Sequence, residues 1–245
     1  MYKNILTLIS CLSIYCFQAS ATTTVDAKIV VGTNAEYPPF TFIENKAIVG
    51  FDIDIANEVA QRLGKAIQFK DMPFDALIPD LVLGNVDFVA AGMSYTAERA
   101  KRVSFTKPYL SEEPLVIFTT SEKNLDIEDL KDKTVVVIEG FTADLFMSSK
   151  KGVNLIRLST QSDGFMAIKS GRADAFVTAK STVSAFFEMQ DSSGYHTTVI
   201  AGTGETCALV VPKNKPEMLV SVQATLDAME KDGTLDKLKT KWKLQ

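Results

Sequence analysis

Short apolar runs and helical patterns alternate along the first half of the chain. Residues 28–32, 66–69 and 86–91 are apolar runs of the length and composition that buried strands have. Between them, apolar residues at helical spacing predict helices over 51–63 and 74–83, each closed by a glycine. This strand–helix–strand–helix–strand order predicts a parallel sheet with helices on both faces.

The second half of the chain repeats this order. Residues 135–138, 153–158 and 173–177 are predicted strands, and residues 142–149 and 163–170 are predicted helices between them. Two units of the same order predict an α/β protein with two similar lobes rather than one continuous sheet.

Two extended crossings join these units in the predicted fold. Residues 114–120 form an extended apolar segment, residues 208–211 return as a strand, and residues 216–243 are largely helical. We expect these boundaries: lobe 1 over 28–112 plus 206–245, lobe 2 over 118–202, and a hinge near 113–118 and 203–208. Ligands of open α/β sheets bind beyond the carboxyl ends of the strands, so the predicted site is the cleft between the lobes.

Composition narrows the functional classes. The chain has 245 residues, 46% of them hydrophobic, and a formal net charge of −4, which gives no sign of a nucleic-acid partner. His196, in a predicted loop, is the single histidine. This argues against the usual histidine-based nucleophilic catalysis and against a multi-histidine metal site. We expect no metal and no cofactor, and a monomeric protein.

Residues 1–21 resemble a secretory signal. Lys3 supplies the positive start, residues 5–17 are mostly apolar, and Ala19-Ser20-Ala21 gives a small-x-small cleavage pattern. The alternatives are an uncleaved membrane anchor and a lipoprotein anchored at Cys11, both of which rank below plain cleavage. Cleavage leaves Cys207 as the only cysteine, and its apolar neighbours favour a buried strand residue.

One segment has the features of a carboxylate site. Gly92-Met93-Ser94-Tyr95-Thr96-Ala97-Glu98-Arg99 follows the apolar run 86–91 and opens a predicted helix. A carboxylate binds well at the start of a helix, where backbone N–H groups, small hydroxyls and one bidentate guanidinium can donate hydrogen bonds to it. Tyr37-Pro38-Pro39-Phe40 and Phe74-Asp75-Ala76-Leu77-Ile78-Pro79 precede it.

In order and spacing, these three segments resemble the periplasmic polar amino-acid-binding proteins that serve ABC transporters, most of all the arginine and basic amino-acid binders. The resemblance covers nearly the whole mature chain. It implies the bilobal periplasmic-binding-protein fold, a periplasmic location, an amino-acid ligand captured by lobe closure, and a membrane permease as partner.

The resemblance also implies roles for individual residues around the ligand's α-carboxylate. It assigns the carboxylate clamp to Arg99, with Gly92, Met93 and Ser94 supplying neighbouring contacts. From the second lobe, Gly140-Phe141-Thr142 contributes to the same carboxylate. Thr142 is also a predicted helix N-cap.

The ligand side chain is expected between two aromatic residues. Tyr37 and Phe74 stand where the family places its flanking rings, although core packing is the alternative for Phe74. Asn34 is neutral at a position where basic amino-acid binders often carry an acid. Glu36 either takes that role or is a surface glutamate. Arginine is therefore favoured, with lysine, ornithine, histidine and glutamine behind.

The chain departs from the family at Ala179. An aspartate usually stands there and pairs with the ligand's α-ammonium group. An unpaired buried ammonium is costly, so another acid or a set of carbonyls must replace the aspartate. Glu205 is the best candidate and Glu139 the next, and either is alternatively a solvated surface charge.

Three classes of function remain open at this point. A binding protein for amino-acid uptake leads. The alternatives are a dehydratase-like enzyme on the same fold, which turnover of prephenate or arogenate would reveal, and a ligand-sensing or surface-interaction protein.

Overall fold

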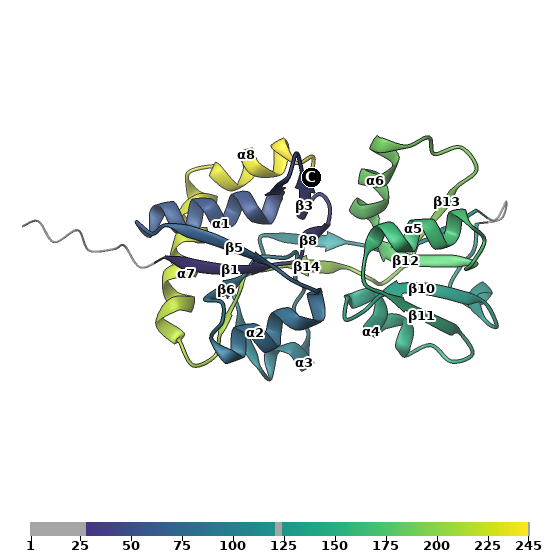
Figure 1. Ribbon diagram of the computed structural model, residues 1–245, viewed down its shortest axis with the longest axis horizontal. Coiled ribbons are helices and arrows are strands. Elements are labelled where there is room, and N and C mark those ends of the chain that lie inside the picture. The colour runs from purple at the N-terminus through teal and green to yellow at the C-terminus, as the bar shows by residue number, and fades with distance from the viewer. Residues whose placement is uncertain (1–27, 121–123, 245) are drawn as a thin grey trace, which may run out of the picture.

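The computed structural model describes residues 28–120 and 124–244 (Figure 1). Two sheets, each flanked by helices, lie next to one another along the long axis of the molecule. The predicted signal segment 1–21 lies outside the described residues. No helix among the described residues is both long and apolar enough to cross a membrane.

The sheet of the first lobe has the strand order β5-β1-β6-β15-β7. Its strands are β1 (Ile29–Thr33), β5 (Ile67–Asp71), β6 (Phe88–Val89), β7 (Val103–Phe105) and β15 (Val210–Pro212). Strand β1 is parallel to β5 and β6, whereas β15 is antiparallel to β6 and β7. The sheet is thus rich in parallel strands, as predicted, and β15 alone runs against its neighbours because the chain returns from the second lobe in the opposite direction.

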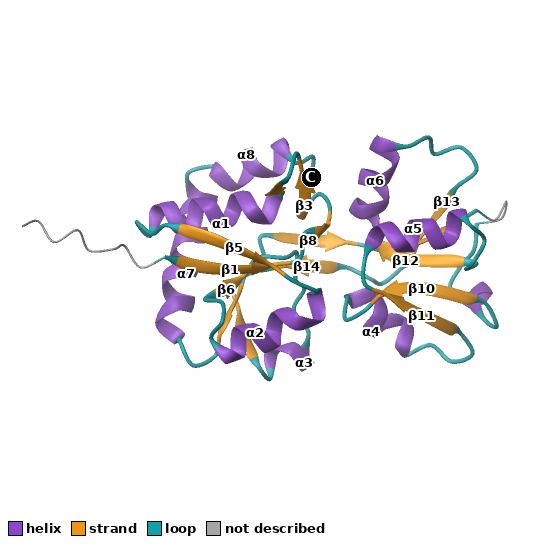
Figure 2. Cartoon of the chain, in the orientation of Figure 1, coloured by secondary structure: helices purple, strands orange, loops and turns teal. Residues whose placement is uncertain are grey.

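Helices cover both faces of this sheet (Figure 2). They are α1 (Phe51–Arg62), η1 (Phe74–Ala76), α2 (Leu77–Leu83), α3 (Ala97–Ala100), α7 (Pro216–Lys231) and α8 (Thr234–Lys241). The predicted helix over 74–83 begins with a 3₁₀ turn. The predicted helical segment 216–243 is broken at Gly233, whose φ of 76° is left-handed.

The sheet of the second lobe has the strand order β11-β10-β12-β9-β13. Its strands are β9 (Leu115–Thr119), β10 (Thr134–Ile138), β11 (Asn154–Leu158), β12 (Ala175–Ala179) and β13 (His196–Val199). Strand β10 is parallel to β11 and β12, and β9 is antiparallel to β12 and β13. His196 therefore begins a strand and is not in a loop, contrary to the prediction.

The helices of the second lobe are η2 (Glu128–Leu130), α4 (Thr142–Ser148), α5 (Gln161–Lys169) and α6 (Lys180–Met189). The helix predicted over 163–170 begins two residues earlier, because Thr160 caps it by accepting a hydrogen bond from the Asp163 N–H group. Helix α6 follows β12 with no turn residue between them and was not predicted.

Two small sheets complete the fold. Strands β2 (Glu36–Tyr37), β3 (Thr41–Glu44) and β4 (Ala47–Val49) form an antiparallel sheet of the first lobe. Strands β8 (Leu110–Glu113) and β14 (Glu205–Cys207) pair with one another between the two large sheets (Figure 1). The lobe and hinge boundaries given above stay predictions; β14 lies within the predicted crossing 203–208, whereas β8 reaches the predicted crossing 113–118 only at Glu113.

Burial explains why the strands of the two large sheets read as continuous apolar runs. Every residue of β12 is buried, as are Val135–Ile138 of β10. Strands that are covered by helices on both faces cannot alternate between apolar and polar residues. The carboxyl ends of β1, β5 and β6 of one lobe face those of β10 and β12 of the other, and this arrangement positions the site.

Candidate functional site

The predicted carboxylate segment is held where β6 ends. Gly92 has a φ of 58°, and a side chain here would collide with the Tyr37 ring, since an added Cβ would lie 2.7 Å from it. Met93 and Ser94 follow and are buried. Helix α3 then begins after Thr96, whose hydroxyl accepts a hydrogen bond from the Arg99 N–H group. The expected helix is only one turn long, so its dipole adds little here.

Arg99 is a buried cation that joins the two lobes. Its Nη1 donates to the Ser94 carbonyl at 2.7 Å, and its Nη2 donates to the Gly140 carbonyl of the second lobe at 2.8 Å. No carboxylate of the described residues forms an ion pair with it. Burial lowers the pKa of Arg99 to about 10, against the opposing effects of Glu205 and Tyr37. A buried guanidinium bonded only to carbonyls is poorly compensated and favours an added carboxylate.

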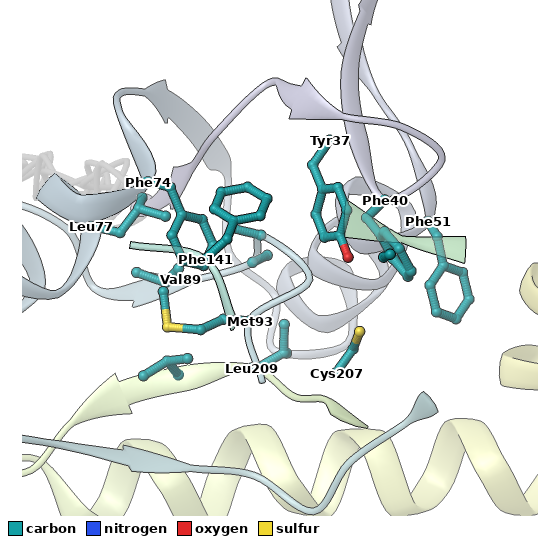
Figure 3. Close-up of a cluster of buried hydrophobic side chains, with 14 of the residues drawn as sticks. Tyr37, Phe40, Phe51, Phe74, Leu77, Val89, Met93, Phe141, Cys207 and Leu209 are labelled. Atoms are coloured by element: carbon teal, nitrogen blue, oxygen red, sulfur yellow. The ribbon is translucent and has the colours of Figure 1, made fainter. Parts of the chain in front are cut away.

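Three aromatic rings meet across the lobes. The ring of Phe141 lies 4.2 Å from that of Phe74 and 5.2 Å from that of Tyr37, measured between centroids (Figure 3). The Arg99 guanidinium stands 5.3 Å from the Phe74 ring centroid. A ligand side chain is expected between Tyr37 and Phe74, and in the structure the Phe141 ring lies against both of these rings.

The segment after β10 supplies the second lobe's contribution. Phe141 is the N-cap of α4, without a side-chain cap bond, and Thr142 is the first helical residue, so the prediction of Thr142 as N-cap is wrong. Asp144 accepts a hydrogen bond from the Gly140 N–H group at 3.1 Å and pairs with Arg157 at 2.9 Å. These contacts fix the Gly140 carbonyl that Arg99 binds.

Asn34 and Glu36 have different surroundings. The Asn34 side chain is buried, its Nδ2 donates to the Met72 carbonyl at 3.1 Å, and its Oδ1 has no hydrogen-bond partner among the described residues. Glu36 precedes Tyr37 in β2, so the two side chains point to opposite faces. Glu36 lines a separate groove of about 960 Å³ between the lobes. Burial, then Asp71 and Asp163, raise its pKa.

A small cavity lies between the two lobes at the end of β12. Its volume is about 10 Å³, and Tyr37, Phe141, Ala179 and Glu205 are among its lining residues. The Tyr37 hydroxyl donates to Glu205 Oε2 over a long 3.5 Å. Glu205 is buried, whereas Glu139, the second candidate for the missing acid, is exposed. The cavity has room for about one water molecule.

Asp52 is a buried acid behind the site that sequence reasoning missed. Its Oδ2 accepts hydrogen bonds from the Gly92 N–H group and the Tyr109 hydroxyl, both at 2.6 Å. Complete burial raises its pKa to about 6, although these bonds lower it. In sequence, Asp52 is one of two acids in the first turn of α1, and no local pattern indicates a contact with Gly92, which lies 40 positions away.

The structure offers no metal centre among the described residues, where no group of three or more histidine, cysteine, aspartate or glutamate residues comes together. Cys207 is buried in β14, as predicted, and burial raises its thiol pKa. What the site brings together is a buried cation, buried carboxylates, aromatic rings and backbone carbonyls.

Comparison with known proteins assigns this arrangement to a class. Residues 29–245 match the family model described as bacterial extracellular solute-binding proteins, family 3, and the chain belongs to that family. ABC transporter arginine-binding protein 1 of Escherichia coli (strain K12) is 32% identical over 244 residues, covering 97% of this chain and 98% of that protein.

Two solved structures extend the comparison. An ancestral arginine-binding protein bound to arginine has a TM-score of 0.83 and 37% identity, covering 88% of this chain and 97% of that one. An ancestral arginine-binding protein bound to glutamine has a TM-score of 0.82 and 36% identity, covering 89% of this chain and 98% of that one. The bilobal periplasmic-binding-protein fold is thereby confirmed. The family is one of binding proteins, which favours that class over an enzyme.

Proposed function

We propose that this chain binds a free L-amino acid between its lobes, with arginine preferred, and delivers it to the permease of an ABC transporter. The observation that carries the proposal is Arg99, a buried cation whose side-chain hydrogen bonds within the described part of the chain go only to the Ser94 and Gly140 carbonyls. An α-carboxylate is the anion that a guanidinium binds in two-pronged geometry. Ser94 adds a buried hydroxyl beside it.

Preference for arginine is supported by four features. Relatives are named arginine-binding proteins. The Phe74 and Tyr37 rings offer π-faces to a planar cation. The unpartnered Oδ1 of Asn34 is a buried acceptor for a guanidinium N–H group, and Glu36 at the groove adds negative charge nearby. A neutral acceptor also suits an amide, so glutamine ranks next, in keeping with the glutamine-bound structure.

Binding must involve separation and closure of the lobes. A cavity of about 10 Å³ cannot admit an amino acid, and Phe141 lies against both aromatic rings. Entry of ligand therefore requires the segment 140–142 to withdraw from the first lobe. Ligand then favours closure because its carboxylate contacts groups of both lobes. The hinge is the predicted pair of crossings near 113–118 and 203–208.

The description of the family as extracellular supports a location outside the cytoplasm. We place the mature chain, residues 22–245, in the periplasm as a monomer, where a permease recognises its closed form. Lipid anchoring at Cys11 stays the lesser alternative.

A thermal-shift screen of the mature chain over the twenty amino acids, ornithine and citrulline tests the proposal after co-purified ligand has been removed. Arginine should raise the Tm most, because a ligand that binds only the folded state stabilises it. If no amino acid raises the Tm, the proposal is wrong. Small-angle scattering should show a smaller radius of gyration with arginine than without it; an unchanged radius would contradict the closure.

A further inference from the structure

The end of β12 lacks a group that an amino acid needs. A free amino acid carries an ammonium group on the carbon that bears its carboxylate, and burying that cation without an acceptor is costly. Ala179 is the last residue of β12, is buried, and lines the cavity between the lobes. Its methyl group offers no acceptor where the family resemblance predicts a carboxylate.

Glu205 brings a carboxylate into the same cavity from another element. It begins β14, the strand that pairs with β8 between the two large sheets, and its side chain lines the cavity with Ala179. It accepts hydrogen bonds from the Tyr37 hydroxyl, at 3.5 Å, and from the Thr142 side chain. Neither donor is a cation, so the Glu205 carboxylate has no ion-pair partner among the described residues.

The segment 140–142 of the second lobe contacts a cation at one end and a carboxylate at the other. Gly140 accepts from Arg99 at 2.8 Å, and Thr142, two residues further on, donates to Glu205. Arg99 and Glu205 attract one another without forming an ion pair. A buried cation and a buried anion held apart in this way complement the carboxylate and the ammonium of one α-carbon.

The other carboxylates near the cavity either have ion-pair or hydrogen-bond partners or are exposed. Asp144 pairs with Arg157, and Asp52 holds the Gly92 N–H group and the Tyr109 hydroxyl. Glu139 is exposed. Glu113 lies opposite Glu205 in the β8–β14 pair. It accepts a hydrogen bond from the Ser181 N–H group at the start of α6, and it lines the separate groove of about 960 Å³ between the lobes.

We propose that Glu205, on the crossing strand β14, receives the α-ammonium group of the bound amino acid in place of an acid at Ala179. This inference rests on the proposed function and specifies one of its contacts. The ammonium would then be bound by the connection between the lobes rather than by the second lobe, so that one ligand contacts the first lobe, the second lobe and the crossing strand.

The test compares arginine with 5-guanidinopentanoate, which is arginine without its α-ammonium group. Calorimetric titrations of wild type and Glu205→Gln with both ligands form a two-by-two comparison. Glu205→Gln should weaken arginine about 10- to 100-fold, the range expected when a hydrogen-bonded charge loses its partner. The affinity for 5-guanidinopentanoate should stay within about threefold, or rise. Equal effects on both ligands, or none on either, would overturn the inference.

Glu113→Gln is the matched control. It removes the neighbouring carboxylate on the partner strand, and it should leave the preference for arginine over 5-guanidinopentanoate within about threefold of wild type. A loss of that preference as large as in Glu205→Gln would assign the effect to local charge rather than to a contact, and would overturn the inference.

Rescue provides the second control. Ala179 is the N-cap of α6 and makes no side-chain cap bond, so an aspartate suits the position structurally. Ala179→Asp in the Glu205→Gln background should restore arginine affinity to within about tenfold of wild type and leave 5-guanidinopentanoate unaffected. Failure to restore it would contradict an ammonium site at this end of β12.

A pH profile of wild type keeps the inference testable if Glu205→Gln does not fold. The charged groups facing Glu205 are Arg99 and Glu113, with the Tyr37 hydroxyl beside them, and burial raises the pKa of Glu205. Arginine affinity should therefore fall more steeply than that of 5-guanidinopentanoate as the pH drops from 7 to 5; parallel profiles would overturn the inference. Wild type that binds neither ligand would instead contradict the proposed function itself.

Discussion

The two lobes contribute different chemistry to the site. The first lobe supplies the buried ionic groups, Arg99 at the cleft and Asp52 behind Gly92. The second lobe supplies the Gly140 carbonyl, the Phe141 ring and the Thr142 hydroxyl.

The second lobe also has a buried acid, Asp144, but this acid is paired with Arg157 and supports the backbone. The first lobe therefore carries a buried cation without an ion-pair partner among the described residues, and the second lobe covers it with a backbone carbonyl and an aromatic ring.

Removing the charge of the first lobe should have the largest effect. Arg99→Ala should weaken arginine binding by several kcal/mol, because it leaves the ligand carboxylate desolvated and without its partner. Arg99→Lys should recover only part of that loss, since an ammonium cannot bind a carboxylate in bidentate geometry. Titration calorimetry measures both. Near-equal affinities of wild type and Arg99→Ala would remove the carboxylate role from this residue.

Asp52 should give the next largest effect, on stability. Its folded-state pKa of about 6 lies above the ordinary aspartate value of 3.8, so the folded protein binds its proton more tightly than the unfolded chain does. Its contribution to the free energy of unfolding is therefore greatest below the unfolded-state pKa and decreases by about 3 kcal/mol over the whole titration, of which about 2 kcal/mol is lost as the pH rises from 4 to 6.

Urea unfolding of wild type and Asp52→Asn at pH 4 and pH 7 isolates this component. The difference between the two proteins should change with pH by about 2 kcal/mol, whereas other titrating groups cancel in the comparison. A difference that is independent of pH would show that Asp52 does not titrate in this range.

Substitution of Gly140 tests how the second lobe closes on the first. Its φ is 76°, and an added Cβ would lie 3.3 Å from the Asp75 side chain of the first lobe. Gly140→Ala should therefore cost about 1 kcal/mol of stability and should also weaken arginine binding about tenfold by obstructing closure.

Gly152→Ala is the control for Gly140→Ala. Gly152 has a φ of 77°, and its added Cβ would meet only the Lys131 side chain at 3.5 Å. It should lose similar stability and retain wild-type affinity. If Gly152→Ala weakened binding as much as Gly140→Ala, backbone strain rather than closure would explain both.

Glu36 should give the smallest effect. Glu36 points away from Tyr37 into the groove of about 960 Å³ between the lobes, where its charge is partly screened. Glu36→Gln should therefore weaken the affinity for arginine by about threefold at most and leave the affinity for glutamine unchanged. Titration with both ligands checks this. A loss of tenfold or more for arginine alone would place Glu36 in direct contact with the distal cation.

The sequence was informative wherever one local pattern determined the structure. The Val-rich β10 and the amphipathic α1 were predicted within about two residues, since burial on one or two faces leaves a clear periodicity. Arg99 and Ser94 were singled out because their segment has a recognisable order, and their role in binding stays a prediction. Helix α6 was missed because Ala179 and Lys180 give no start signal between the strand and the helix.

Features that depend on contacts between distant segments were beyond sequence reasoning. The approach of Phe141 to Phe74 and Tyr37 exists only once the two lobes meet. The contact of Asp52 with Gly92 joins residues 40 positions apart, and no pattern in either segment predicts it. Glu205 was a candidate in sequence, but only its burial beside Ala179 separates it from the exposed Glu139.

The most direct test of the central claim is the affinity of wild type for arginine and for agmatine, which is arginine without its carboxylate. Both ligands keep the guanidinium that the aromatic rings and Asn34 would receive, so the comparison isolates the carboxylate that Arg99 is proposed to bind. We expect agmatine to bind at least about 30-fold more weakly than arginine, since removing one partner of a buried charge pair costs about 2 kcal/mol or more. Equal affinities would contradict it.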